Sequence, residues 1–147
     1  MILISHRGNI NGSNPLKENH PDYIKEALNA DYDVEVDVWY TDKLMLGHDN
    51  PQYEFDIHTF LVYYGKNIWW HCKNIKALNY FQNYSCAYLN YFWHEEDTIT
   101  LTSQNYIWAY PGKQPIKDSI AVMPEFNNDD TSQCLGICSD YIVNYKK

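Results

Sequence analysis

Acidic and β-branched residues alternate strictly in the segment from Asp33 to Val38. Such alternation over a short run is typical of a β-strand, in which successive side chains point to opposite faces. Glu35 and Asp37 therefore share one face, with Cα atoms about 7 Å apart. Carboxylates at that separation can hold a hard divalent cation such as Mg²⁺ or Ca²⁺, which prefers oxygen ligands. The pattern is equally typical of a strand with one solvated face, so the metal interpretation depends on its surroundings.

Polar side chains also end two neighbouring apolar runs. The first run, residues 2–5, leads to His6 and Arg7, and the second, residues 44–46, leads to His48. We expect both runs to be strands, and sites in α/β proteins assemble at the carboxyl ends of strands. Histidines, an arginine and carboxylates beside a metal can perform acid–base chemistry on a phosphate ester.

Four short motifs follow one another in this part of the chain: His6-Arg7-Gly8, Glu18-Asn19-His20, Glu35-Val36-Asp37-Val38 and Gly47-His48-Asp49. This ordered set resembles the H-R-G, P-E-N-T, E-x-D and H-D motifs of the glycerophosphodiester phosphodiesterases. That family belongs to the phospholipase-C-like phosphodiesterases, which have a TIM-barrel fold. The second motif departs from the family pattern, with Lys17 in place of the proline and His20 in place of the threonine. The resemblance covers residues 2 to 49, about a third of the chain.

The resemblance implies a phosphoric diester hydrolase that acts on a small glycerophosphodiester. It implies His6 and His48 as the acid–base pair and Arg7 as a phosphate-binding residue. It also implies that Glu35 and Asp37 bind a divalent metal, Mg²⁺ or Ca²⁺, with Mn²⁺ as a further candidate.

A third polar-ended run covers residues 68–74, which we expect to be a buried strand with His71 and Lys73 on one face. In the resembled family the third strand carries an E-x-K pair, a glutamate on the metal and a lysine near the phosphate. Lys73 aligns with that lysine, and His71 takes the place of the glutamate. Neutral imidazole binds divalent metals but favours softer ions than Mg²⁺ or Ca²⁺. His71 is therefore either a metal ligand or a hydrogen-bonded core histidine. Glu95, in an acidic run after the strand predicted over residues 87–93, is a candidate substitute ligand unless that run is a solvated turn.

The length of 147 residues indicates a single domain, residues 1–147. The resemblance implies that this domain is of the phospholipase-C-like phosphodiesterase type. A full TIM barrel typically needs about 250 residues. We therefore expect an α/β fold in the form of a reduced or truncated TIM (β/α) barrel, with helices mainly in the first half and loops replacing helices in the second half. An incomplete barrel leaves strand edges that another subunit could cover, so an oligomer is left open.

Capping residues and apolar spacing predict the helices. We expect one from Pro21 to about residue 29, one between Asp56 and Gly65, and one after Asn74 with Ile75, Leu78 and Phe81 facing inward. Beyond residue 97 the chain shows short β-like runs separated by turn signals, and a last helical turn is expected after residue 140. The predicted runs cover residues 98–101, 106–110, 120–123 and 135–139.

Composition narrows the choice of partners. The net charge of −8 and the pI of about 5.0 disfavour binding to nucleic-acid backbones and anionic membranes. No apolar stretch approaches the roughly 20 residues of a membrane span, and the chain begins directly with a predicted strand.

The four cysteines lack C-x-x-C spacing, so we expect reduced, mostly buried thiols in a cytoplasmic protein. The 14 Tyr, 5 Trp and 5 Phe either fill the core or line a mouth for a sugar, a base or an acyl chain.

The function that these residues favour is metal-dependent hydrolysis of a small phosphodiester by histidine acid–base catalysis. The nucleophile is either water or a hydroxyl group of the substrate, which would give a cyclic phosphate first. The alternative is a non-catalytic phosphate-ester or glycan-binding module on a degenerate barrel. A phosphodiesterase that acts on nucleotides or on another small diester is a third interpretation.

Overall fold

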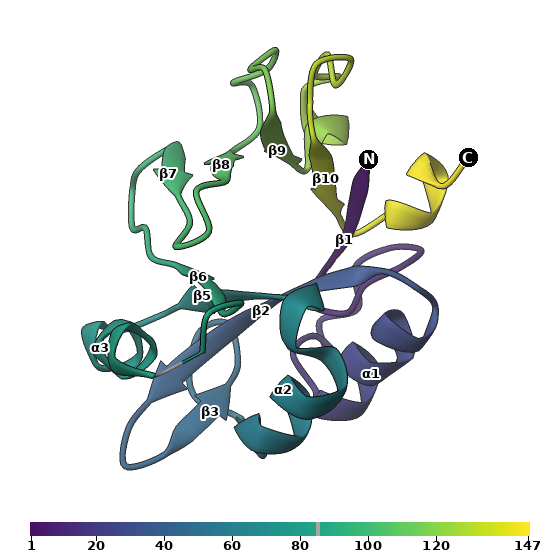
Figure 1. Cartoon of the computed structure of the whole chain (residues 1–147). Helices are drawn as coiled ribbons and strands as arrows, with labels where there is room; N and C mark the ends of the chain where they lie inside the picture. The colour runs from purple at the N-terminus through teal and green to yellow at the C-terminus, as the bar shows by residue number, and fades with distance from the viewer. Residues whose placement is uncertain (85) are drawn as a thin grey trace.

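One strongly curled mixed sheet organises the computed structural model, which describes residues 1–84 and 86–147 (Figure 1). Seven strands run parallel, in the spatial order β6-β5-β2-β1-β10-β9-β8. Their bounds are β1 Ile2–His6, β2 Asp33–Tyr40, β5 Ile68–Cys72, β6 Asn90–Phe92, β8 Ile107–Ala109, β9 Ser119–Val122 and β10 Gly136–Ser139. Three short strands add antiparallel pairs: β3 (Leu44–Leu46) on β2, β4 (Tyr53–Glu54) on β3, and β7 (Ile99–Leu101) on β8.

The sheet forms a half-barrel and does not close, so the expectation of a mixed α/β fold with an incomplete barrel is confirmed at this level. The ladder ends at β6 on one side and at β7 on the other. Isolated hydrogen bonds span the seam between these two strands. The Ser103 N–H donates to the Tyr91 carbonyl at 2.8 Å, and the Thr100 hydroxyl donates to the Trp93 carbonyl at 3.2 Å. Both edge strands are three residues long and β7 is antiparallel to β8, so a parallel ladder cannot continue across the seam.

The expected distribution of helices is confirmed. The three α-helices all lie before residue 84: α1 (Pro21–Asn29), α2 (Ile57–Tyr64) and α3 (Ile75–Asn83). They gather on one side of the sheet, while the segment from β7 to β10 runs through loops (Figure 1). The helical elements among the described residues after 86 are two short 3₁₀ turns, η2 (Pro124–Phe126) and η3 (Ile142–Tyr145). A further such turn, η1 (Gly65–Asn67), follows α2.

Local sequence signals set the helix ends. Pro21 occupies the first turn of α1. The Asp56 carboxylate accepts the His58 N–H at the start of α2, and the Asn74 side chain accepts the Ala77 N–H at the start of α3, as predicted. The predicted inward face of α3 was partly wrong. Ile75 is 52% exposed, because the buried stripe of this helix is formed by Ala77 and Phe81.

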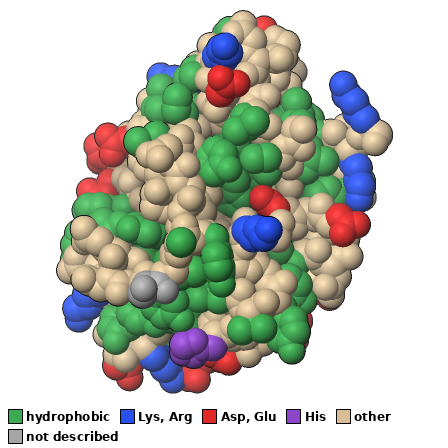
Figure 2. Space-filling view, in the orientation of Figure 1, with side chains coloured by type: hydrophobic (Ala, Val, Ile, Leu, Met, Phe, Trp, Pro, Cys, Tyr) green, Lys and Arg blue, Asp and Glu red, His purple; other side chains and the backbone are tan. Residues whose placement is uncertain are grey.

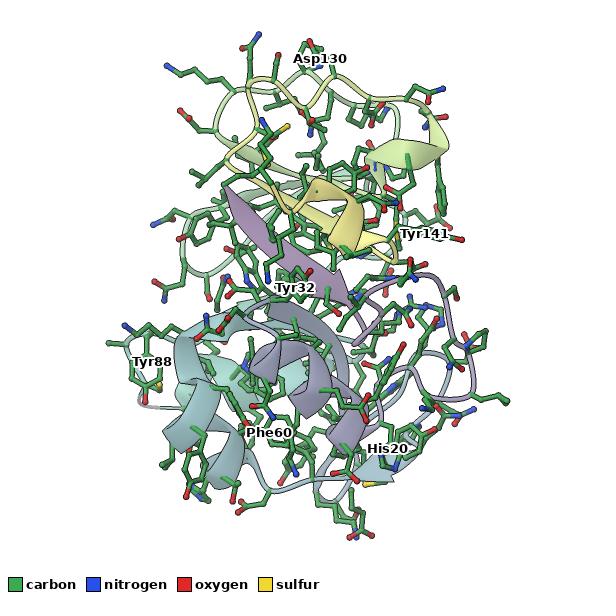
Figure 3. All side chains as sticks on the ribbon, turned by 90° about the vertical axis from the view of Figure 1, so that its right-hand side faces the viewer. His20, Tyr32, Phe60, Tyr88, Asp130 and Tyr141 are labelled. Carbon is green, nitrogen blue, oxygen red and sulfur yellow. The ribbon has the colours of Figure 1, made fainter. Side chains whose placement is uncertain are left out.

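Apolar packing differs on the two faces of the sheet. On the outer face, the valines of β2 pack with Trp70 and the helices in one cluster that includes Phe60. On the inner face, a second cluster contains Ile4, Trp69 and Trp108. In the side view, Phe60 lies among the helices, whereas Tyr32 lies where the two halves of the molecule meet (Figure 3). On the inner face of β1 and β5, Ile4 is followed by His6 and Trp69 is followed by His71. These two polar side chains therefore lie above an apolar floor.

The surface and the cysteines complete the description. Hydrophobic side chains cover the middle of the face shown in Figure 2, and charged side chains are scattered mainly around its rim. The four cysteines are free thiols, of which Cys72 and Cys138 are buried. Among the described residues, no helix is both long and apolar enough to cross a bilayer.

Candidate functional site

The site is built on the inner face of β2. Strand alternation sends Val34, Val36 and Val38 outward, so Glu35 and Asp37 point inward. These two carboxylates are 2% and 0% exposed, which rules out the interpretation of a solvated strand face. Ionised groups buried this deeply require nearby cations, hydrogen bonds or a metal.

His71 brings a nitrogen ligand to the carboxylate pair. β5 runs parallel to β2 with His71 opposite Asp37, and the imidazole Nδ1 lies 3.0 Å from Asp37 Oδ1 and 3.5 Å from Glu35 Oε1. Ligand atoms of the three residues lie within 4.8 Å of one another, so the group could hold a metal ion. Burial alone would lower the pKa of His71, but the contacts with Asp37 and Glu35 outweigh it and raise that pKa.

Cations and an amide surround Asp37. Arg7 Nε lies 2.9 Å from Asp37 Oδ2, and Lys73 Nζ lies 3.5 Å from Oδ1. The Asn19 amide donates to Oδ2 at 2.9 Å, and its oxygen accepts the Asp37 backbone N–H at 2.9 Å. Burial would raise the pKa of Asp37, but the contacts with His71 and the charges of Arg7 and Lys73 hold it well below its usual range.

His6 is held between two carboxylates. It ends β1 opposite Glu35, with Nε2 3.8 Å from Glu35 Oε2. On the other side of the ring, Nδ1 lies 2.8 Å from Asp140 Oδ1, and Asn9 donates to the same oxygen at 2.8 Å. Burial would raise the pKa of Asp140, but these hydrogen bonds and the nearby positive charge lower it. A carboxylate on Nδ1 leaves Nε2 as the nitrogen that faces the site.

Charge and hydrogen bonding both fit a divalent cation. Four carboxylates lie within this network, those of Glu18, Glu35, Asp37 and Asp140, against the two permanent cations Arg7 and Lys73. With His6 and His71 in the neutral form, in which an imidazole binds a metal, the network keeps two uncompensated negative charges. In addition, Glu35 Oε2 is buried without a hydrogen-bond partner among the described residues. An orphaned buried carboxylate oxygen is what a bound cation would satisfy.

His48 lies at the rim of this network. β1 pairs with β2 at residues 33–35 and β3 pairs with it at residues 38–40, while β5 takes the opposite edge of β2. β1 and β3 thus flank one edge, and the Gly47 N–H donates to the Asp37 carbonyl at 3.1 Å. The His48 side chain itself is 42% exposed, and its ion-pair partner within the described residues is Asp49.

The structure does not bring Glu95 to the metal-binding group. This residue is exposed, in the acidic turn after β6, and it is not a member of the group around Glu35. The preceding residue, His94, does reach the site, with its ring stacked on that of His71 at 4.4 Å between centroids and 12° between planes.

Sequence reasoning missed His94 and its partner Tyr110. The Tyr110 hydroxyl hydrogen-bonds to His94 Nε2. Burial, followed by the charge of His71, lowers the pKa of His94 to about 4, so its ring is neutral at pH 7. Both residues follow short strands, β6 and β8, and a search for polar residues at all strand ends would have found them. Asn19 and Asp140 carried a weaker signal in the sequence. Asn19 belongs to the Glu18-Asn19-His20 motif, and Asp140 directly follows a predicted strand.

Comparison of the chain with family models, with curated proteins and with solved structures finds no match.

Proposed function

We propose that the protein is a metal-dependent phosphodiesterase that hydrolyses a small phosphodiester of the glycerophosphodiester type, on a truncated TIM-like barrel. The single observation that supports this proposal most is the convergence of polar residues from three strands on one buried centre. His6 and Arg7 from β1, Glu35 and Asp37 from β2, and His71 from β5 meet at the carboxyl ends of three adjacent parallel strands. That location is where α/β barrels place their sites.

Glu35, Asp37 and His71 would hold the divalent ion. When bound, the ion supplies Lewis-acid polarisation of a non-bridging phosphate oxygen. The imidazole among its ligands favours Mn²⁺ or Zn²⁺ over Mg²⁺ and Ca²⁺, because nitrogen is a softer donor than a carboxylate oxygen.

The acid–base roles fall to His6 and His48. Asp140 fixes the His6 ring through Nδ1, which leaves Nε2 to move a proton at the reacting centre. His48 stands at the same edge of β2 and would serve as the second acid–base group once a substrate occupies the rim. Lys73 carries a positive charge toward the phosphate. Arg7 is already engaged with Asp37 and Glu18, so its first task is to hold these carboxylates in place.

A second candidate is a phosphate-ester binding module without catalytic activity. The exposed position of His48 and its pairing with Asp49 favour this alternative, because they leave one acid–base group outside the buried centre.

Hydrolysis of bis(p-nitrophenyl) phosphate and glycerophosphocholine, with Mg²⁺, Ca²⁺, Mn²⁺ or Zn²⁺ and after chelation, tests the proposal. We expect metal-dependent turnover that is lost in Glu35→Gln and falls by about 10²- to 10⁴-fold in His6→Ala. Glu54→Gln is the matched control, since its carboxylate is exposed on β4 and bonds to Lys43. Metal binding without turnover on either substrate would favour the binding module.

A further inference from the structure

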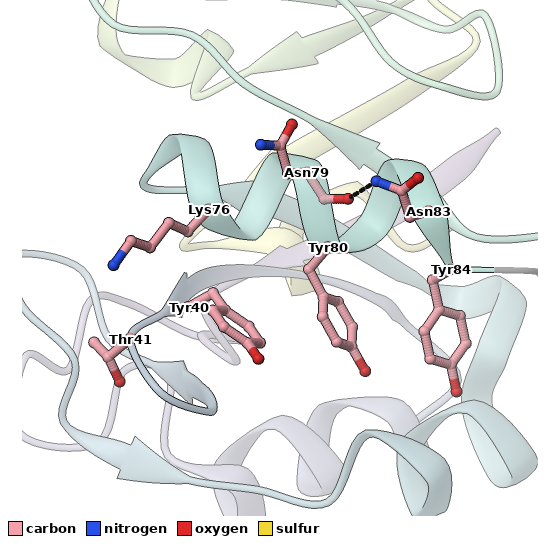
Figure 4. A pocket seen from close by; sticks show the side chains of 7 residues that line it. All are labelled: Tyr40, Thr41, Lys76, Asn79, Tyr80, Asn83 and Tyr84. Atoms are coloured by element: carbon pink, nitrogen blue, oxygen red, sulfur yellow. Dashed lines mark hydrogen bonds between the residues drawn. The ribbon is translucent and has the colours of Figure 1, made fainter.

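A second concave site lies on the outside of the half-barrel, between α3 and the end of β2 (Figure 4). It has a volume of about 520 Å³, which falls within the range of small-molecule sites. Its walls are formed by Tyr40, Lys76, Asn79, Tyr80, Asn83 and Tyr84, together with Thr41. We call this site the tyrosine groove.

Three tyrosine rings form one wall of the groove. Tyr80 lies in the last turn of α3, and Tyr84 is the residue that directly follows this helix. The ring of Tyr40 stacks on that of Tyr80, with centroids 5.3 Å apart, and Tyr80 follows Tyr84 at 5.5 Å. The three side chains point in the same direction from the backbone (Figure 4). Such a row offers apolar ring carbons and phenolic hydroxyls at once.

The position of this wall is fixed before any ligand binds. The Asn74 side chain accepts the Tyr40 N–H at 3.2 Å and donates to the Tyr40 carbonyl at 2.9 Å. Because Asn74 also caps α3, it ties the end of β2 to the helix that carries Tyr80 and ends directly before Tyr84. A groove with a preformed wall loses little conformational entropy on binding.

The polar groups of the groove are nearly all uncharged. Asn79 and Asn83 lie on the exposed face of α3. Asn83 donates one amide hydrogen to the Asn79 carbonyl at 2.8 Å, which leaves its side-chain oxygen free to accept a hydrogen bond. Lys76 is the single cation among the lining residues.

This chemistry selects the kind of ligand. One lysine in a chain of net charge −8 does not attract a polyanion, and the amides would be left without partners by a purely apolar ligand. A ligand with hydroxyl groups on its rim and C–H groups on its faces satisfies both the amides and the rings. We propose that the tyrosine groove binds a neutral saccharide, such as a disaccharide segment of a glycan.

The groove is separate from the metal-binding group. Tyr40 shares the outer face of β2 with the valines, whereas Glu35 and Asp37 point to the inner face. Saccharide binding therefore does not depend on the proposed phosphodiesterase activity, and either proposal can fail without the other.

A titration of ¹⁵N-labelled protein with maltose, cellobiose and N,N′-diacetylchitobiose, followed by amide chemical shifts, tests the inference. We expect at least one disaccharide to shift amides of α3 and of Tyr40, with a dissociation constant on the order of 1 mM. Tyr80→Ala and Asn79→Ala should each weaken this binding about tenfold or more. Asn79 is exposed on a helix, where alanine is a good helix former, so this variant keeps the fold.

Tyr63→Ala is the matched control, because Tyr63 is 73% exposed on α2 and does not line the groove. The Tyr63→Ala variant should bind the disaccharide with the same affinity as the wild type. The absence of any shift with all three disaccharides, or shifts that persist unchanged in both Tyr80→Ala and Asn79→Ala, would overturn the inference. A proline-rich peptide that shifts the same amides when no disaccharide does would also overturn it, since aromatic grooves serve such peptides as well.

Discussion

The amide of Asn19 should be one of the strongest single contributors to the stability of the site. It accepts the backbone N–H of Asp37 and donates to the Asp37 carboxylate, both at 2.9 Å, and Asp37 is fully buried. Removal of the side chain deletes a charge-assisted hydrogen bond, with a contribution of about 2 kcal/mol, and orphans a buried N–H, which costs about 1 to 2 kcal/mol more. We therefore expect Asn19→Gly to lower the free energy of unfolding by about 3 kcal/mol.

The backbone at this position adds a second, separable effect. Asn19 has φ of +62°, in the left-handed region that asparagine and glycine adopt more readily than alanine. Asn19→Ala should consequently lose about 1 kcal/mol more than Asn19→Gly. Urea denaturation at pH 7 in the presence of a chelator measures both values, and in thermal unfolding the Asn19→Gly loss corresponds to a Tm about 10 °C lower.

Asn83→Ala provides the control for a lost side-chain amide. Asn83 is exposed and makes one hydrogen bond to a helix carbonyl, so its replacement should change the unfolding free energy by less than about 0.5 kcal/mol. If Asn19→Gly costs less than about 1 kcal/mol, water replaces the amide without penalty, and the account of Asp37 as a group held by protein hydrogen bonds is wrong.

Three further outcomes are expected. His71→Ala should weaken Mn²⁺ and Zn²⁺ binding, measured by calorimetry, more than Mg²⁺ binding, because it removes the soft ligand; equal losses would exclude His71 from the metal. Gly47→Ala should destabilise the protein by at least about 2 kcal/mol in urea, since Gly47 has φ of +147° and an added Cβ would collide with the Asn50 carbonyl oxygen; a neutral effect would contradict this geometry. Burial alone would raise the pKa of both Glu18 and Asp140, but hydrogen bonds and nearby cations lower both in the folded state. Their stabilisation is therefore present above the unfolded pKa of about 4 and is lost as the pH falls through the lower folded values. The unfolding free energy should decrease as the pH falls below about 5, and this decrease should be less steep in Asp140→Asn. An identical pH profile for this variant and the wild type would argue against the His6–Asp140 pair.

Local patterns predicted the elements well. The alternation in β2 placed three valines on a buried face, and Pro21, Asp56 and Asn74 marked the starts of the helices. These features depend on neighbours within a few residues, and sequence spacing records such neighbours directly.

Features that depend on distant strands were predicted less well. The seam between β6 and β7 arises because β7 folds back antiparallel on β8, and no residue pattern specified that direction. His94 reaches His71 only because β6 lies beside β5, and the sequence pattern pointed instead to the neighbouring Glu95, as a metal ligand. The structure brings His6, Arg7, Glu35 and Asp37 together, and the sequence could predict this because these residues directly end or form strands that adjoin in both sequence and space.

The pairing of β1 with β10 has a consequence for the order in which the protein folds. Ile2 pairs with Gly136, so the centre of the sheet joins segments more than a hundred residues apart. During synthesis, β1 can gain β2 early, but its other edge stays open until residues 136–139 leave the ribosome. Long-range parallel pairing of this kind is slow, and an open apolar edge is prone to aggregation in the interval. The same step delivers Asp140 to His6, so the His6–Asp140 hydrogen bond forms last, when the sheet itself is complete.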